Sequence, residues 1–168
     1  MSWTFSTAQP GTKKQWLRSQ VNNCTIQSIT ELNSLLNQMQ PPSTCELNVD
    51  YNFFKTGLGT SWEKYPNGGR WVIPVASKHN VDAIWNNLME KLVTQDIPNI
   101  DHICGIVLKV RTGRFKITLW TRTHEQQANE QIGRHVKDVL EIAGQISFVD
   151  HKPDPMGAAN LPKFLYSV

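Results

Sequence analysis

Apolar residues recur at helical spacing in three segments of the chain. The first segment follows a capping box at Ser28 and Glu31, and Pro41 ends it. The second covers residues 80–94. The third follows a second expected capping box, Thr123 and Gln126, and its expected stop is Gly144. The positions predicted to face inward are Leu32, Leu35, Leu36 and Met39, then Ile84, Trp85, Leu88 and Leu92, then Ala128, Ile132, Val136, Val139 and Leu140.

Strand-like segments lie around these helices. Alternating apolar positions at 47–53 predict one strand, and residues 104–110 and 115–121 around a Thr112–Gly113 turn predict a hairpin. The apolar run 70–75 contains Pro74, which indicates an edge strand or a bulge. We expect Trp3 in an edge strand, further strands at 145–149 and 164–168, and loops at 7–12 and 151–160.

This order of elements predicts an α+β protein with antiparallel strands and the helices on one face of the sheet. We expect one domain over residues 1–168, with 1–13 and 151–163 loosely held. A hydrophobic fraction of 39% and a charged fraction of 18% argue against disorder and against a membrane protein. Residues 1–6 lack a basic segment, so we expect no secretory signal. The three cysteines form no CxxC pair, which argues against a disulfide framework and a zinc site.

The predicted hairpin separates charged from apolar side chains. A two-residue turn places Arg111 opposite Arg114, Lys109 opposite Lys116, and Gly105 opposite Trp120. One face then carries Lys109, Arg111, Arg114, Lys116, Thr118 and Trp120, and the other carries Cys104, Ile106, Leu108, Val110, Phe115, Ile117 and Leu119. A slip of one residue would bury the charges, which is prohibitive. The charged face suits a nucleotide, with phosphates near Arg111 and Lys116 and a base near Trp120.

Six tryptophans are many for 168 residues, and Trp16 and Trp62 lie in loop-like sequence. An exposed indole is a stacking surface for a nucleobase. The neighbouring Glu63 could accept two parallel hydrogen bonds from the donor edge of guanine. A guanine methylated at N7 is cationic, so two flanking indoles and one carboxylate would select it over the neutral base.

The chain resembles the translation initiation factor 4E family, which binds the 7-methylguanosine cap of messenger RNA. The resemblance covers about residues 14–150 and keeps the family's order of motifs. The matching stretches are 14–16 (KQW), 51–55 (YNFFK), 62–63 (WE), 68–71 (GGRW), Trp85, 104–111 (CGIVLKVR), 116–121 (KITLWT) and 132–134 (IGR).

The resemblance implies a curved antiparallel sheet, three helices on its convex face and a ligand slot on its concave face. Trp16 and Trp62 would sandwich the base, Glu63 would bind its donor edge, and Trp120 would contact the N7 methyl group. Arg111 and Lys116 would hold the phosphates, with Arg70 acting through water. Lys109 and Arg114 complete the basic cluster expected around the phosphates. Trp71 and Trp85 would be structural. No cofactor or metal is implied, and we expect a monomer in the cytoplasm, with the nucleus as an additional location.

The resemblance also implies a protein partner, a scaffold-type initiation factor or a repressor peptide, on the helical surface around Ile29, Asn33, Leu36 and Asn86. Asn33 stands where the family has a tryptophan. Asn86 and Asn87 stand where it has apolar and acidic residues. These differences leave open a different partner or a different docking mode.

Three other functions compete with cap-dependent initiation. An enzyme is disfavoured because the five histidines lack metal-ligand spacing and no nucleophile motif or phosphate-binding glycine loop is present. We therefore expect the histidines to be surface or capping residues. A cap-binding repressor, or a factor in another step of messenger RNA processing, would keep the cap site but not the usual scaffold. A generic single-stranded RNA binder would not prefer 7-methylguanosine.

Overall fold

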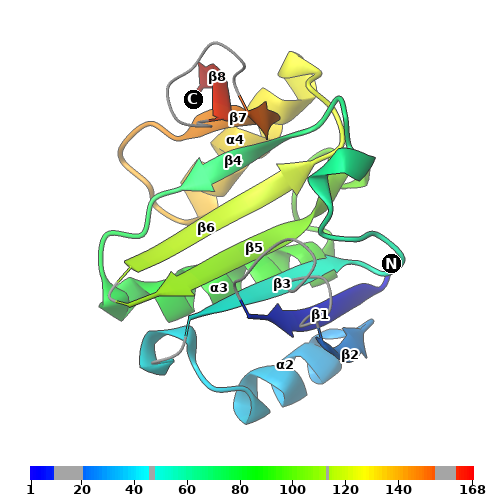
Figure 1. Ribbon diagram of the computed structural model, residues 1–168, viewed down its shortest axis with the longest axis vertical. Helices are drawn as coiled ribbons and strands as arrows, with labels where there is room; N and C mark the ends of the chain where they lie inside the picture. Colours follow the sequence, from blue (N-terminus) through cyan, green and yellow to red (C-terminus); the bar gives the residue numbers. More distant parts are fainter. Residues whose placement is uncertain (10–20, 46–47, 113, 154–161) are drawn as a thin grey trace.

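A computed structural model describes residues 1–9, 21–45, 48–112, 114–153 and 162–168. These residues form one antiparallel sheet of eight strands in the order β2-β1-β3-β5-β6-β4-β7-β8 (Figure 1). Its strands are β1 (Trp3–Ala8), β2 (Val21–Ile26), β3 (Val49–Lys55), β4 (Gly69–Ile73), β5 (Ile103–Arg111), β6 (Arg114–Thr121), β7 (Ser147–Pro153) and β8 (Pro162–Ser167).

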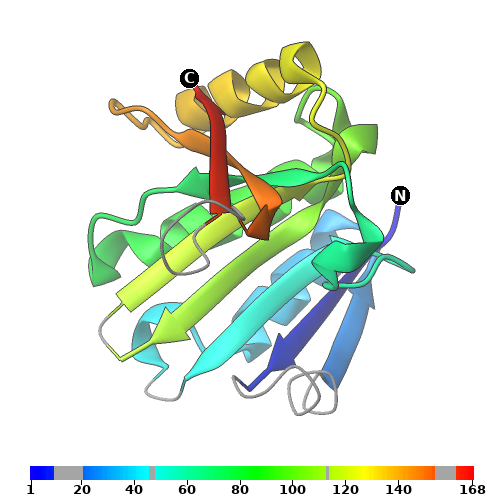
Figure 2. The same cartoon turned by 45° about the horizontal axis from the view of Figure 1, so that its top comes forward.

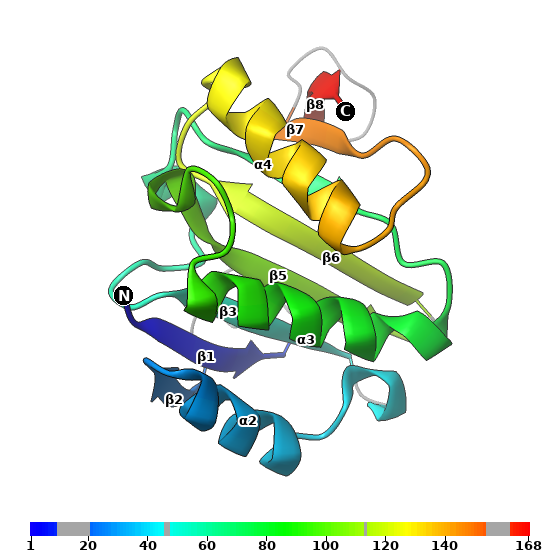
Figure 3. The ribbon, with the colours of Figure 1, turned by 180° about the vertical axis from the view of Figure 1, so that it is seen from behind.

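Within the described ranges, three α-helices cover one face of the sheet, as the view from behind shows (Figure 3). They are α2 (Ile29–Gln38), α3 (Lys78–Thr94) and α4 (Gln126–Val139), and the 3₁₀ turns are η1 (Pro42–Thr44), η2 (Trp62–Lys64) and η3 (Ile100–His102). The sheet is curved, and its concave face lies on the side away from the helices (Figure 2). This arrangement confirms the predicted α+β fold.

The first two helices begin with capping boxes. In α2, the Ser28 hydroxyl accepts from the backbone N–H of Glu31 at 3.3 Å, and the Glu31 carboxylate accepts from the N–H of Ser28 at 3.1 Å. This box is the predicted one. Helix α3 begins two residues before the expected start, because Ser77 caps it together with Asn80.

The expected limits of α4 are wrong at both ends. Its N-cap is Glu125 rather than Thr123, whose hydroxyl accepts instead from the N–H of Glu125. Gln126 donates to the Glu130 side chain and so does not close a capping box. The helix ends at Val139, and Glu141 takes a left-handed φ of 53°, so the chain turns well before Gly144.

Two predicted edge strands lie inside the sheet. β1 runs between β2 and β3, and Trp3 is fully buried and stacked on Phe53 at 5.5 Å. β4 lies between β6 and β7 and ends at Ile73, so Pro74 follows the strand and removes no ladder hydrogen bond. Two expected loops are also shorter, since β1 extends to Ala8 and β7 extends to Pro153.

The hairpin register is the predicted one, with Arg111 opposite Arg114, Lys109 opposite Lys116, and Gly105 opposite Trp120. One expected side chain is on the wrong face. The register shifts between Ile103 and Gly105, and Cys104 therefore packs with Trp120 on the concave side instead of facing the helices. A single extra residue in one strand reverses the alternation beyond it.

The core between sheet and helices is centred on buried aromatic rings. Trp71 and Trp85 are both fully buried, which confirms their structural role. Helix α4 approaches the sheet closely because Gly133 has no side chain. A Cβ atom at Gly133 would lie 2.5 Å from Cζ2 of the Trp71 ring.

We expect Gly133→Ala to lower the free energy of unfolding by about 1–3 kcal/mol, because a buried indole has no room to move and α4 must shift outward. Gly144→Ala is the matched control, since a Cβ there meets no atom within 4 Å. Chemical denaturation of both variants checks this contact. Equal stability of the two variants would contradict it.

Candidate functional site

The concave face carries side chains in three rows that cross the strands. The register of β3, β5, β6 and β4 defines each row. The aromatic row contains Phe54, Gly105, Trp120 and Arg70. The middle row contains Asn52, Val107, Thr118 and Val72. The charged row contains Asp50, Lys109 and Lys116. Neighbouring rows are two residues apart along each strand, which is about 7 Å.

The aromatic row forms a small second core on the concave side. Phe54 and Trp120 pack edge to face with centroids 5.5 Å apart. Tyr65, Cys104 and Val107 complete the cluster, and Trp62 packs against it while remaining half-exposed. Trp120 is 8% exposed, and its Nε1–H donates to the Thr118 hydroxyl at 3.1 Å. The indole is therefore fixed in orientation, with only a small part of its surface accessible.

The 3₁₀ turn η2 presents Trp62 and the exposed Glu63. Tyr65 anchors this turn from behind, because its buried hydroxyl donates to the Gly59 carbonyl at 2.8 Å. Burial raises the pKa of Tyr65 to about 12, so the phenol stays protonated and remains a donor. Sequence reasoning missed Tyr65, although an aromatic residue three positions after Trp62 was a usable signal.

At the charged end, Arg111 of β5 lies against the neighbouring strand β3. Its Nη1 is 2.8 Å from Oδ1 of Asp50 and also donates to the carbonyls of Val110 at 2.7 Å and Val49 at 3.3 Å. The contact with Asp50 lacks hydrogen-bond directionality and is therefore mainly Coulombic. Only 6% of the Asp50 side chain is exposed. Sequence reasoning missed Asp50, although its alternation with Val49 and Tyr51 places it on this face.

Three other predicted phosphate ligands, Lys109, Arg114 and Lys116, are exposed. Although Lys116 is exposed as a whole, desolvation of its amine, followed by the nearby charges of Arg70 and Lys109, lowers the pKa of Lys116. Cations this close repel one another, so an anion bound among them is favoured.

Arg70 is held behind Trp120 by a buried histidine. Nε2–H of His151 donates to the Thr121 carbonyl at 3.2 Å, which leaves Nδ1 to accept from Arg70 at 3.4 Å. The His151 ring lies 4.5 Å from the Trp120 ring. His151 is 4% exposed, so its expected place on the surface is wrong. The reason is that β7 continues through it, where the sequence indicated a loop.

Trp16, the second predicted stacking residue, lies outside the described residues. The predicted partner surface lies on the helical side. Ile29 is 38% exposed, Asn33 is exposed, and Leu36 and Asn86 are half-buried. The face around Asn33 thus has an apolar rim and a polar centre.

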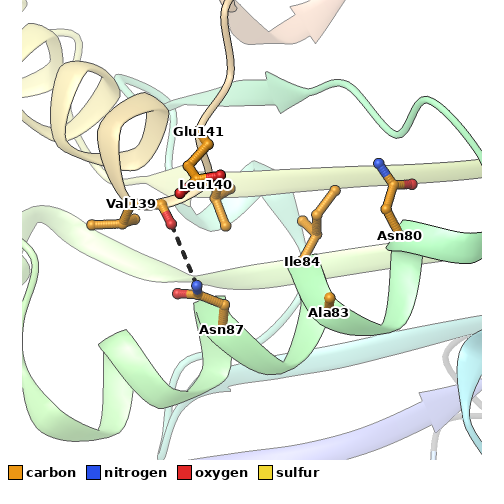
Figure 4. A pocket seen from close by; sticks show the side chains of 7 residues that line it. All are labelled: Asn80, Ala83, Ile84, Asn87, Val139, Leu140 and Glu141. Carbon is orange, nitrogen blue, oxygen red and sulfur yellow. Dashed lines mark hydrogen bonds between the residues drawn. The ribbon is translucent and has the colours of Figure 1, made fainter.

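A pocket of about 310 Å³ opens between α3 and α4, on the helical side of the sheet (Figure 4). Its lining consists of Asn80, Ala83, Ile84, Asn87, Val139, Leu140 and Glu141. It contains none of the predicted nucleotide-binding residues. In the described part of the chain, no cluster of histidine, cysteine or carboxylate side chains could hold a metal ion. None of the described helices is long and apolar enough to span a membrane.

Comparisons with known proteins agree with this fold. A sequence model of the family described as Eukaryotic initiation factor 4E matches residues 1–160. The eukaryotic translation initiation factor isoform 4E of Solanum lycopersicum is 32% identical over 155 residues, which cover 89% of this chain and 77% of that protein. The structure is similar to Ascaris suum eIF4E-3 in complex with an m2,2,7G cap, with a TM-score of 0.85, 26% identity, and coverage of 99% of this chain and 95% of that chain. A schistosome eIF4E complexed with m7GpppA and 4E-BP gives a TM-score of 0.86, 26% identity, and coverage of 99% and 96%.

The buried His151 predicts a pH-dependent stability. Burial, and then the nearby Arg70 charge, lowers the pKa of His151 from 6.5 to about 4. Below pH 6.5 this histidine is protonated in the unfolded chain, whereas in the folded protein it stays neutral down to about pH 4. The contribution of this group is therefore complete above pH 6.5 and is lost as the pH falls, by about 3 kcal/mol in total.

We expect His151→Gln to flatten this fall in urea unfolding measured from about pH 7 to about pH 4.5. His79→Gln is the control, because His79 is exposed. An unchanged pH dependence in the His151 variant would refute the assignment.

Proposed function

Because the chain belongs to the eukaryotic initiation factor 4E family, we propose that it binds the 7-methylguanosine cap of messenger RNA and acts in translation initiation or its regulation. One observation carries the proposal: the aromatic row and the charged row lie on one concave face, with Trp62 and Glu63 at the aromatic end. A nucleotide has the same arrangement from end to end, with a flat base at one end and phosphates at the other. The family consists of translation factors rather than enzymes.

The base binds at the aromatic end in this proposal. Trp62 supplies one stacking face, and Trp16 is proposed for the other. Glu63 accepts from N1–H and the exocyclic amino group of guanine, a donor pair that no other standard base presents. A methylated N7 makes the base cationic, which strengthens both the stacking and the attraction to the carboxylate. Trp120 contacts the methyl group through the exposed part of its indole.

The phosphates bind at the charged end. Lys109, Lys116 and Arg114 are exposed cations on the face that continues from Trp120. Arg111 joins them while Asp50 and two backbone carbonyls hold its guanidinium in place. A preorganised cation loses less conformational entropy when the ligand arrives. Arg70, fixed by His151 beside Trp120, assists through water.

The proposed partner is a scaffold-type initiation factor or a repressor peptide on the α2–α3 surface, since the schistosome relative was crystallised with 4E-BP. The exposed Asn33 at its centre favours a second candidate role, a cap-binding repressor that does not recruit the usual scaffold. In either role the protein acts as a single cap-binding domain over residues 1–168, as a monomer in the cytoplasm or the nucleus.

The function is tested by titration with 7-methylguanosine triphosphate and guanosine triphosphate. We expect the methylated nucleotide to bind clearly more tightly, with quenching of tryptophan fluorescence. Trp62→Ala and Glu63→Ala should each lose about 1–3 kcal/mol of binding free energy, through stacking and through unpaired base donors respectively. The affinity of the Trp62→Ala variant is measured by calorimetry, because the substitution removes one of the tryptophans whose fluorescence would be followed.

Glu90→Ala is the control for charge, since Glu90 is exposed on α3 on the other side of the sheet. Equal affinity for the two nucleotides would favour a generic single-stranded RNA binder and defeat the proposal.

The role is tested by capture of partners on immobilised 7-methylguanosine triphosphate. Co-purification of a scaffold protein and a helicase indicates initiation. If Asn33 weakens docking of a helical motif, Asn33→Trp should increase the amount of scaffold captured, because a large apolar ring restores buried contact area. If the parent protein captures as much scaffold protein as the Asn33→Trp variant does, the result argues against the repressor role.

A further inference from the structure

The middle row of the concave face contains a buried amide without a partner. Asn52 is 1% exposed, and within the described part of the chain neither its Nδ2 nor its Oδ1 has a hydrogen bond. Buried polar side chains in folded proteins nearly always have a partner. An unpaired amide in the sheet therefore costs stability and calls for an explanation.

Asn52 differs from the other buried or half-buried asparagines with an unpaired atom. Asn129 donates to the carbonyls of Thr123 and Glu125, and Asn87 donates to the carbonyl of Val139. Each of those amides is thus tied into the fold through one end and leaves only its oxygen unpaired. The Thr118 hydroxyl, the other polar group of the middle row, lies two strands from Asn52 and accepts from Trp120.

The position of Asn52 indicates which part of a ligand could meet it. On β3 it lies between Phe54, at the aromatic end, and Asp50, which pairs with the phosphate-directed Arg111. Each of these neighbours is two residues away, about 7 Å along the strand. In a nucleotide, the group between base and phosphates is the ribose. Its 2′- and 3′-hydroxyls donate and accept, as the two ends of an amide do.

We propose that Asn52 binds the ribose hydroxyls of the cap nucleotide. The inference rests on the proposed cap-binding function and adds a contact that recognises the ribose. Because the Asn52 side chain is 1% exposed, the atoms that bury it must move aside for the ribose to reach it. No hydrogen bond of the Asn52 side chain to the described protein has to break when this happens.

The test compares 7-methylguanosine triphosphate with its 2′,3′-dideoxy form by calorimetry. We expect the parent protein to bind the ribonucleotide about 5- to 30-fold more tightly, the range expected for one or two net hydrogen bonds. Asn52→Ala should bind both nucleotides equally, at the affinity of the parent for the dideoxy form. Asn87→Ala, on the opposite side of the sheet, should keep the full preference for the ribonucleotide.

Thermal unfolding without ligand gives an independent readout. Because the amide has no protein partner, Asn52→Ala should be no less stable than Asn87→Ala, which loses a hydrogen bond. Failure of Asn52→Ala to fold would overturn the proposal, since the amide would then support the fold itself.

The outcomes separate the two proposals. If the parent binds both nucleotides with the same affinity, Asn52 does not bind the ribose, and the proposed ribose contact is wrong. This is the result expected if a water molecule pairs with the amide. The proposed cap binding would be unaffected. A preference for the ribonucleotide that survives in Asn52→Ala also overturns the ribose contact. If the parent binds neither nucleotide, the proposed function itself fails.

Discussion

The alternation of side chains along antiparallel strands is the constraint on which the rest of this structure depends. In the β5–β6 hairpin it places Ile106, Leu108 and Ile117 against the helices and leaves the cations on the opposite face. Burying those cations would cost far more than any turn could compensate. The same register aligns β3 and β4 with the hairpin. One pairing thus builds both the core and the three rows of the concave face.

The concave face combines buried polar groups with exposed cations such as Lys109 and Lys116. Asp50, Asn52 and His151 are all buried, although each carries a polar or ionisable group. Asp50 is offset by Arg111, and His151 is kept neutral between Arg70 and a backbone carbonyl. These contacts fix cations and aromatic rings before a ligand arrives. We infer that the stability given up at Asn52 is recovered when the ribose binds.

The two faces of the molecule have separate roles. The helices bury Trp71 and Trp85 and expose the α2–α3 surface, whereas the concave face holds the proposed cap site. Because the sheet separates the two surfaces, we expect a change at Asn33 to affect the proposed partner surface and to leave the proposed nucleotide contacts intact. Family membership therefore supports cap binding more directly than it supports a particular partner.

The sequence by itself determined the features that follow from local periodicity and chemistry. The capping box at Ser28, the hairpin register and the family motifs around Trp62 are all readable along the chain, because they depend on residues close together in sequence. Tertiary structure decided the rest. The interior position of Trp3 and the burial of His151 depend on strands that are distant in sequence. The burial of Asp50 and Asn52 likewise arises only when β1, β3 and β5 lie side by side, because burial depends on neighbours in space.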